Sequence, residues 1–419
     1  MGNIGTNFVV CERSRLRGVA CSPLKCPGFS EDGVPKGRKS DKQSALSDLC
    51  GGEACELFRK NAGQQRYGEG EHRINPRPAN TRSSCIARRM NKQFVLILIV
   101  LHLATIVRAE KPRILFDTDI TGDVDDVLAL AMCHTLADRG ACDFLGVTIS
   151  KHHPLTASFA DALNTFYGRP DLPVGVTRDP DAQQRESKYL KLADAPEYPH
   201  DLRVNADAAD AVELLRKILS AQPDRSVSII SVGIASNLAN LLKSPDGIEL
   251  VGRKVRVLSL MAGAFALCNG TNYHLEANVV NGIGYMQTVA EKWPDDVPIV
   301  WSGYEIGEAL PFPRIVVRQD FDYQPRHLVK EAYLLHSGAQ HDRPCWDQSS
   351  VLWAVYPDRG YFGLSQPGRV QVMDDGFTRF TATKGGAGIQ RDRFLTMNSL
   401  QRSRVLESIV NLTVNPPPR

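Results

Sequence analysis

Residues 113–130 read RILFDTDITGDVDDVLAL and join a short apolar run to an acidic turn and a second apolar pattern. Five carboxylates lie within ten positions of this stretch, at Asp117, Asp119, Asp123, Asp125 and Asp126. Two carboxylates about 5 Å apart repel each other by roughly 3 kcal/mol at an effective dielectric constant of about 20. A folded site must therefore protonate some of these acids or neutralise them with a cation.

Apolar runs of strand length alternate with segments of helical period from residue 110 to the end of the chain. Strands are expected at 113–116, 143–149, 227–232, 254–261 and 297–302. Helices are expected at about 125–139, 156–168, 207–220, 236–243, 283–293 and 325–336. Continuous Val, Ile and Leu strands that alternate with helices are typical of a parallel sheet covered on both faces. We predict one α/β domain, residues 110–419, with a mostly parallel central sheet flanked by helices.

The five acids follow the first expected strand and begin the first expected helix. Ligands of such sheets bind at the carboxyl ends of the strands, and a helix N-terminus favours negative charge at Asp125 and Asp126. A solvated acidic helix cap would explain these two residues but not Asp117 and Asp119, which precede the turn. The pattern therefore indicates a ligand site rather than a cap.

Residues 1–89 differ in composition from the rest of the chain. They contain 16 Lys and Arg against 9 Asp and Glu, a net charge of +7, which leaves −4 for residues 90–419 of a chain whose total is +3. They also hold six of the ten cysteines, and the alternative of a Cys-rich metal module has no CxxC pair to support it. We interpret residues 1–89 as a disordered or mis-annotated extension, and we expect no nucleic-acid partner.

Residues 90–109 have the pattern of a signal peptide. Met90 and Lys92 precede an apolar stretch from Phe94 to Val107, and Ala109 suits a cleavage site. These 14 residues would span about 21 Å as a helix, less than the roughly 30 Å of a bilayer core, which disfavours a stable membrane anchor. If Met90 is the true start, the protein is secreted or periplasmic. The cysteines that follow, Cys133, Cys142, Cys268 and Cys345, have no motif spacing, and we expect buried thiols.

Two families begin with an apolar strand followed by Asp-x-Asp. Asp117-Thr-Asp119-Ile-Thr121 resembles the first motif of haloacid dehalogenase-like phosphatases, but this leaves Asp123, Asp125 and Asp126 unexplained. The other resemblance is to the inosine-uridine preferring nucleoside hydrolases, and it extends over nearly all of residues 111–380. The family's opening Asp-x-Asp followed by Asp-Asp-x-x-Ala-Leu is matched from Asp117 to Leu130. The spacer between these two parts is two residues longer here than in the best-known members of the family, and it contains Asp123. Whether Asp123 joins the site is left open.

Three later segments extend the resemblance to the nucleoside hydrolases. SVGIASNLANLL, residues 231–242, resembles the family's turn with a metal-binding carbonyl, which implies that role for Val232. LMAGAF at 260–265 and HLEANVV at 274–280 resemble the ribose-binding segments and imply substrate contacts for Met261, Glu276 and Asn278. A further substrate-binding Asn would be Asn269 or Asn272.

The segment WDQSSVLWAVYP, residues 346–357, matches the late metal-binding Asp of the family with Asp347. Trp346 stands where many members carry a histidine that protonates the leaving base. This resembles the purine-preferring branch, in which aromatic stacking helps the base to leave, and the alternative is that Trp346 packs in the core. His336 and His341 are either surface residues or the missing acid.

An all-oxygen set of aspartates and a carbonyl suits Ca²⁺ or Mg²⁺ rather than Zn²⁺, and the resemblance implies Ca²⁺. It further implies a Rossmann-like nucleoside hydrolase fold, a metal site and ribose contacts at Asp125, Asn278, Glu276 and Asp347. The ion would be held by Asp119, Asp126, Asp347 and the Val232 carbonyl, and Asp119 would also act as the base. The expected reaction is hydrolysis of a ribonucleoside to base and ribose. A phosphatase and a non-catalytic calcium-stabilised nucleoside- or ribose-binding protein are the alternatives, and a homo-oligomer is left open.

Overall fold

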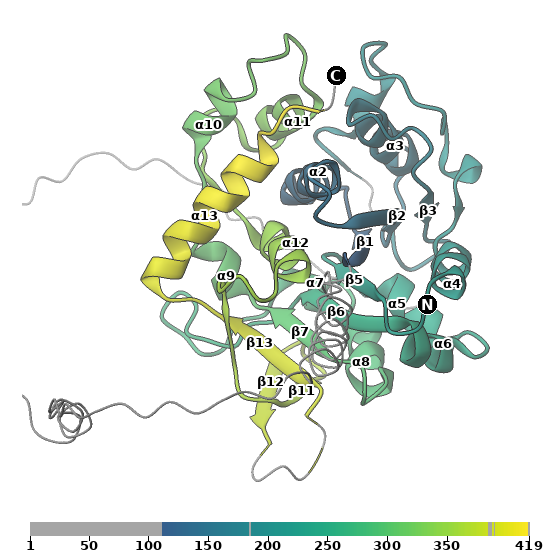
Figure 1. Cartoon of the computed structure of the whole chain (residues 1–419), viewed down its shortest axis with the longest axis vertical. Coiled ribbons are helices and arrows are strands. Elements are labelled where there is room, and N and C mark those ends of the chain that lie inside the picture. The colour runs from purple at the N-terminus through teal and green to yellow at the C-terminus, as the bar shows by residue number, and fades with distance from the viewer. Residues whose placement is uncertain (1–110, 184–185, 384–387, 389, 418–419) are drawn as a thin grey trace, which may run out of the picture. The chain divides into compact units, whose positions relative to one another are not determined.

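The computed structural model describes residues 111–183, 186–383, 388 and 390–417. The expected extension 1–89 and signal peptide 90–109 lie outside these residues. The central sheet is arranged around β1 (Arg113–Thr118), which pairs in parallel with β2 (Asp143–Ile149) on one side and β5 (Val227–Ser231) on the other (Figure 1). The acidic stretch therefore follows the middle strand of the sheet.

The strand order is β12-β11-β13-β7-β6-β5-β1-β2-β3-β4. All pairs from β13 to β4 are parallel, whereas β11 and β12 form an antiparallel hairpin at one edge. The predicted mostly parallel α/β sheet is thus confirmed, with a mixed edge. The remaining strands are β3 (Val174–Val176), β4 (Ala209–Asp210), β6 (Val255–Met261), β7 (Ile299–Ser302), β11 (Gly368–Val372), β12 (Thr378–Ala382) and β13 (Asp392–Thr396). Outside this path, β10 (Gly363–Leu364) pairs with β13, and β8 (Pro311–Phe312) pairs with β9 (Arg343–Pro344).

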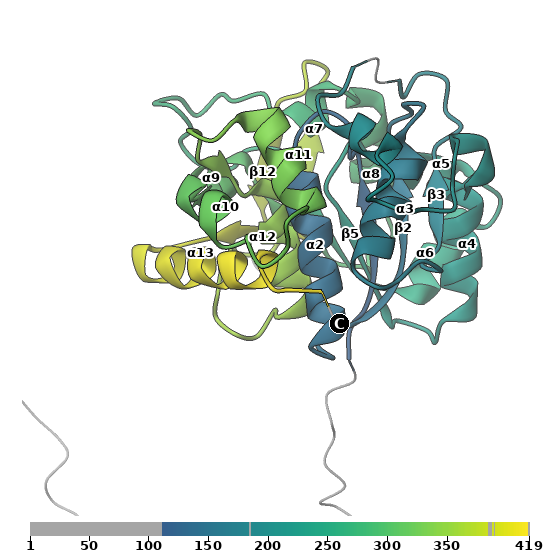
Figure 2. The ribbon, with the colours of Figure 1, turned by 90° about the horizontal axis from the view of Figure 1, so that it is seen from above.

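Alternate residues of β1 enter two hydrophobic cores on opposite faces of the sheet. Ile114 and Phe116 pack with one group of helices and Leu115 with the other, because successive strand side chains point to opposite faces. The first group is α2 (Asp125–Asp138), α3 (Thr156–Phe166), α10 (Arg314–Gln319), α11 (Leu328–Ser337), α12 (Trp346–Val355) and α13 (Ser399–Thr413). The second is α4 (Ala211–Ala221), α5 (Ser236–Lys243), α6 (Gly247–Lys254) and α8 (Ile283–Lys292), and Figure 2 shows the layers from above.

The expected elements differ from the observed ones mainly at their ends. The helix expected from 207 begins at Ala211, because the Asp210 side chain accepts a hydrogen bond from the Glu213 N–H at 3.0 Å and caps it. Several observed elements were not expected. They are the helices α6, α7 (Ala277–Val280), α9 (Tyr304–Glu308), α10 and α13, the short strands β3, β4, β8, β9 and β10, and the strands β11, β12 and β13 toward one edge of the sheet.

Two expectations concern the chain as a whole. Cys133, Cys142, Cys268 and Cys345 are free and buried, as predicted. In the described part of the chain, no helix combines the length and apolarity needed to cross a membrane.

Candidate active site

A cavity of about 500 Å³ lies at the carboxyl ends of the central strands. This volume is within the range of small-molecule sites. Asp119 follows β1, Lys151 follows β2, Val232 follows β5, Met261 ends β6 and Tyr304 follows β7, and all five line it. Residues from five strand ends therefore meet in one place, as the rule for parallel sheets requires.

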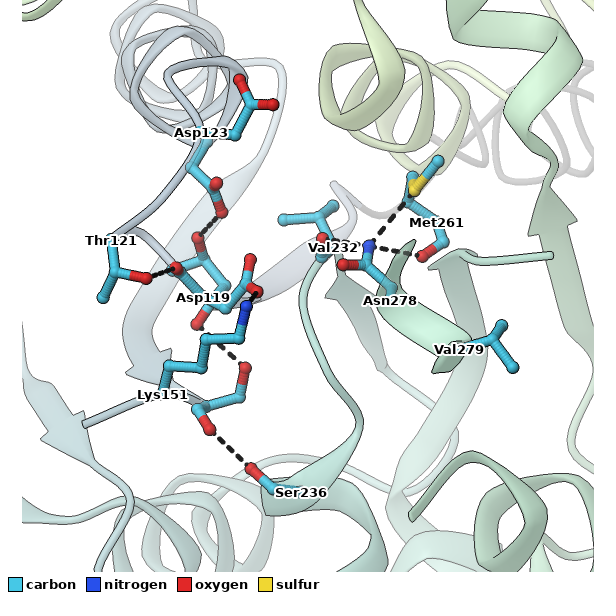
Figure 3. Close-up of polar contacts among 12 residues, drawn as sticks. Asp119, Thr121, Asp123, Lys151, Val232, Ser236, Met261, Asn278 and Val279 are labelled. Atoms are coloured by element: carbon cyan, nitrogen blue, oxygen red, sulfur yellow. Dashed lines mark hydrogen bonds and ion pairs between the residues drawn. The ribbon is translucent and has the colours of Figure 1, made fainter. Parts of the chain in front are cut away.

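Asp119 is held at the cavity wall by an ion pair. Its Oδ2 lies 2.7 Å from the Nζ of Lys151, and its backbone carbonyl accepts a hydrogen bond from the Thr121 hydroxyl at 2.8 Å (Figure 3). The charge of Asp119 raises the pKa of Lys151. Lys151 therefore stays charged, offsets part of the charge of Asp119 and fixes the direction of its carboxylate.

Asp125, Asp126 and Asp347 form a buried group of carboxylates. Each offers an oxygen, and these atoms lie within 4.8 Å of one another. Burial first, and then repulsion from neighbouring aspartates, raises the pKa of each well above its ordinary value. Thr118 donates a hydrogen bond to Asp126, but no cationic side chain that lines the cavity pairs with the three, since Lys151 pairs with Asp119 and Arg343 with Asp123.

This group fits a hard divalent cation. Three carboxylates at this separation repel strongly when charged, and an oxygen-binding cation removes that repulsion. The donors are oxygens without sulfur or imidazole, which suits Ca²⁺ or Mg²⁺. Two of the predicted ligands, Asp126 and Asp347, lie in the group, and so does Asp125, which was predicted to bind substrate. Asp119 is paired with Lys151 instead.

The carbonyl predicted as a ligand also reaches the cavity. Val232 follows β5, and its oxygen accepts a hydrogen bond from the Asn278 Nδ2 at 2.7 Å, which leaves a second lone pair. The next residue, Gly233, has no room for a side chain, because a Cβ would lie 2.5 Å from the Asp119 backbone nitrogen. The turn after β5 thus approaches the turn after β1 closely enough for both to border one site.

Asn278 and Met261 contact each other beside this carbonyl. The Asn278 Nδ2 also lies 3.1 Å from the Met261 oxygen and 3.2 Å from its sulfur (Figure 3). Both residues line the cavity, and no donor among the described residues bonds to the Asn278 Oδ1, which leaves this oxygen for a ligand hydroxyl.

Glu276 lines the same wall of the cavity. Its carboxylate accepts hydrogen bonds from the backbone N–H groups of Asn278, Val279 and Gly263 at 2.8, 3.2 and 3.1 Å. Burial raises its pKa to about 7 despite these bonds. Glu276 therefore both caps α7 and offers the cavity a carboxyl group that titrates near neutrality.

The other end of the cavity is lined by aromatic rings. The rings of Tyr304 and Trp346 lie 5.5 Å apart, and the His274 ring lies 4.0 Å from that of Tyr304. The Trp346 Nε1 donates to the Tyr304 carbonyl at 3.0 Å, and the Arg343 guanidinium lies 5.0 Å from the centre of the indole. Trp346 is half-buried at the cavity wall rather than enclosed in the core.

Several predicted residues lie elsewhere. Asn269, His336 and His341 are not among the residues that line the cavity. His336 is bonded to Ser337 at 2.8 Å, His341 is exposed, and Asn269 is exposed with a left-handed φ of 50°. Their predicted roles stay predictions that the geometry does not support.

Asp117 has a structural environment. Its carboxylate is fully buried and accepts hydrogen bonds from Thr148, Ser231 and Asn237, each at 2.8 Å. Burial raises its pKa to about 6. These bonds join the ends of β1, β2 and β5, so Asp117 fixes the strands below the cavity and does not line it.

Four cavity residues with charged or aromatic side chains were missed from the sequence: Lys151, His274, Tyr304 and Arg343. The ends of β2 and β7 offered a signal, because Lys151 comes two residues after β2 and Tyr304 two residues after β7. His274 lies on a loop and Arg343 in the two-residue strand β9, and neither had a comparable signal.

Comparison with known proteins gives three kinds of result. The sequence profile described as inosine-uridine preferring nucleoside hydrolase matches residues 114–386. No curated protein matches the chain in sequence. Among solved structures, a plant nucleoside hydrolase, the PpNRh1 enzyme, is similar with a TM-score of 0.57 at 18% identity, covering 73% of this chain and 100% of its own.

Two bacterial structures are similar in the same way. A purine-preferring ribonucleoside hydrolase from Gardnerella vaginalis has a TM-score of 0.55 at 16% identity and covers 72% of this chain and 98% of its own. An inosine-uridine preferring nucleoside hydrolase from Bacillus anthracis has a TM-score of 0.54 at 15% identity, with coverages of 72% and 99%. At these identities the structures establish a shared fold.

Proposed function

We propose that this chain, which belongs to the inosine-uridine preferring nucleoside hydrolase family, hydrolyses the N-glycosidic bond of ribonucleosides and depends on calcium to do so. Family membership implies N-ribohydrolase activity. The calcium dependence rests on the group of three buried carboxylates, Asp125, Asp126 and Asp347. None of the three forms an ion pair with a cationic side chain that lines the cavity. An all-oxygen set of this kind suits a hard cation, which would offset the charge of the three carboxylates.

The ion would be held by Asp126, Asp347 and the Val232 carbonyl, with Asp119 and Asp125 as the further carboxylates at the same strand ends. When bound, calcium orients the attacking water and lowers its pKa. Asp119 accepts the proton of that water, and its ion pair with Lys151 supports this role, because the pair fixes one carboxylate oxygen and leaves the other for the water.

The carboxylate and amide groups of the cavity would bind the hydroxyl groups of the ribose. Asp125 would accept a hydrogen bond from the 2′-hydroxyl, Asp347 and Asn278 would bind the 3′-hydroxyl, and Glu276 the 5′-hydroxyl. The bond to the base breaks through a state with positive charge on the ribose ring, and nearby carboxylates stabilise that charge. A buried hydroxyl-binding group left unpaired costs about 1–3 kcal/mol, so 2′-deoxynucleosides should be poor substrates.

The two alternatives differ in what they require. Asp117, the first acid of the phosphatase-like motif, is fully buried and bonded to three side chains, so it is not available to a substrate. A non-catalytic binding protein would keep the calcium and ribose contacts without turnover.

Hydrolysis assays separate these functions. The purified protein should release hypoxanthine from inosine and no phosphate from p-nitrophenyl phosphate, and EDTA should abolish the first activity until calcium is restored. Ribose or inosine binding without product would identify a binding protein, and chelator-resistant phosphate release would identify a phosphatase.

A further inference from the structure

An ion pair between Arg343 and Asp123 lies at the aromatic end of the cavity. Asp123 lies in the acidic turn after β1, in the spacer that is two residues longer than in the best-known members of the family. The Arg343 Nε donates to the Asp123 Oδ1 at 2.9 Å, and its Nη2 contacts the Asp123 Oδ2. Both side chains line the cavity and are partly exposed, 21% for Arg343 and 33% for Asp123. Asp123 therefore holds a guanidinium group and is not part of the carboxylate group that fits a cation.

Further hydrogen bonds hold both partners of the ion pair in place. The Asp123 carboxylate accepts the Val124 N–H at 2.6 Å, and its carbonyl accepts the Tyr189 hydroxyl at 2.5 Å. The Arg343 N–H donates to the Tyr333 hydroxyl at 2.9 Å. The two-point pairing with Asp123 then sets the plane of the guanidinium.

The indole beneath the guanidinium is also held in place. Trp346 donates its Nε1 hydrogen to the Tyr304 carbonyl at 3.0 Å. Gly307 packs against it so closely that a Cβ there would lie 2.5 Å from the Trp346 Cα. Arg343 lies over the ring at 5.0 Å from its centre, a distance at which a cation and an indole attract each other. Arg343 and Trp346 thus form one rigid surface at the cavity wall.

This surface offers donors to a ligand. A guanidinium carries five N–H donors and no acceptor, and the pairing with Asp123 uses Nε and Nη2. Among the described residues, no acceptor is bonded to Nη1. The remaining donors therefore suit an oxygen or nitrogen acceptor on a planar ring that enters the cavity.

Nucleoside hydrolysis creates such an acceptor. When the C1′–N bond breaks, the electron pair stays on the ring nitrogen of the base, and the negative charge spreads to its exocyclic oxygen. The water oxygen bonds to C1′, its proton passes to Asp119, and the base takes a proton from solvent after it leaves. A fixed cation beside the base stabilises the charge that develops in this step.

We propose that Arg343, positioned by Asp123 against Trp346, binds the departing base and stabilises its negative charge, in place of a histidine acid. This rests on the proposed hydrolysis and adds a substrate class, the nucleosides with an oxo group on the base. An amino group in that position is a hydrogen-bond donor and would face the N–H donors of Arg343, so inosine should be preferred to adenosine.

Leaving-group dependence tests the proposal with the calcium-loaded protein. Hydrogen bonds to charged groups are strong enough that Arg343→Gln should lower kcat/KM for inosine roughly 10- to 150-fold. p-Nitrophenyl riboside, whose leaving group is already a stable anion, should lose much less. Arg343→Lys should recover part of the activity on inosine, and Arg343→Gln should narrow the ratio of inosine to adenosine turnover.

Variants of neighbouring residues separate positioning from packing. Asp123→Asn keeps the side-chain volume and should lower kcat/KM for inosine less than Arg343→Gln does. As with Arg343→Gln, kcat/KM for p-nitrophenyl riboside should fall less than that for inosine. Arg314, which pairs with Asp342 at 3.6 Å and does not line the cavity, provides the matched control, and Arg314→Gln should leave both substrates unaffected. Melting curves with and without calcium establish that each variant folds, and Arg343→Lys decides the outcome if Arg343→Gln does not fold.

Three results would overturn the proposal. Equal losses on both substrates would make Arg343 a packing residue. A selective loss on inosine in His274→Gln together with normal activity in Arg343→Gln would assign the base to His274. If the unaltered protein cleaves neither substrate, the proposed hydrolysis fails and this assignment fails with it.

Discussion

The two ends of the cavity are built in different ways. The carboxylate end, formed by Asp119, Asp125, Asp126, Glu276 and Asp347, comes mostly from residues next to the ends of central strands or at the start of a helix. The aromatic end is formed by His274 on a loop, Arg343 in the short strand β9, and Tyr304 and Trp346 in the first turns of α9 and α12. The carboxylate end concentrates charge that needs a cation, whereas the aromatic end already holds its cation, Arg343, paired with Asp123. In the proposed function, the carboxylate end binds the sugar and carries the reaction, and the aromatic end binds the base.

The largest effect is expected at Asp119, because its proposed role is specific to turnover. Asp119→Ala should lower kcat by about 10²–10⁴-fold, the usual contribution of a general base, and should weaken ribose binding far less. Kinetics on inosine and equilibrium binding of ribose measure the two effects. Asp296→Ala, which removes an aspartate paired with Arg225 away from the cavity, is the control and should change neither. Near-normal kcat in Asp119→Ala would end the assignment of the base.

The Trp346 side chain tests the aromatic end. Stacking on a nucleobase contributes about 1–3 kcal/mol, so Trp346→Ala should cost roughly 5- to 150-fold in kcat/KM for inosine. Purine nucleosides, with larger rings, should be cleaved faster than uridine by the unaltered protein. p-Nitrophenyl riboside should be spared most of the loss, and Trp346→Phe should retain part of the activity. Equal losses on inosine and p-nitrophenyl riboside would indicate that the indole only packs.

Removal of calcium should destabilise the carboxylate end. A ligand at 100 times its dissociation constant stabilises the folded state by about 2.7 kcal/mol, so EDTA should lower the melting temperature and calcium should restore it. Asp347→Asn should lower the response to calcium, because it removes one of the three clustered carboxylates. A melting temperature that EDTA leaves unchanged, after metal analysis has established that the protein is metal-free, would contradict the calcium site.

A smaller effect should appear as a pH dependence of stability in the metal-free protein. Burial raises the pKa of Asp117 to about 6 and that of Glu276 to about 7, above the ordinary values of 3.8 and 4.5. The folded protein binds these protons more tightly than the unfolded chain, so their stabilisation is complete below about pH 4 and is lost as pH rises to about 7. The raised pKa values of Asp125, Asp126 and Asp347 act in the same direction.

Thermal unfolding at pH 5 and pH 8 at constant ionic strength measures this effect. The melting temperature of the metal-free protein should be lower at pH 8, and calcium should reduce the difference. Asp117→Asn should lower stability at both pH values and flatten the slope, since it removes a titrating group. If the metal-free protein were more stable at pH 8 than at pH 5, ionisation of these acids would not destabilise the folded state, and the prediction would be wrong.

Much of the fold could be predicted from the sequence. The expected strands at 113–116, 143–149 and 227–232 correspond to β1, β2 and β5, and the expected helix at 236–243 coincides with α5. These elements have continuous apolar runs or a clear helical period, which depend on residues close together in the chain. The hairpin of β11 and β12 was missed because its strands, GRVQV and TRFTA, have polar residues between the apolar ones and therefore contain no continuous apolar run.

The sequence by itself determined that acids would gather at the end of β1, because a buried strand and a following helix fix the positions of Asp119, Asp125 and Asp126 within one turn of chain. It did not determine which acid would be left without a cation. Only the tertiary structure pairs Asp119 with Lys151 and Asp123 with Arg343, the latter across 220 positions of the sequence. The physical reason is that backbone periodicity acts over a few residues, whereas the partner of a charge depends on which distant loops the packed sheet brings to the same strand ends.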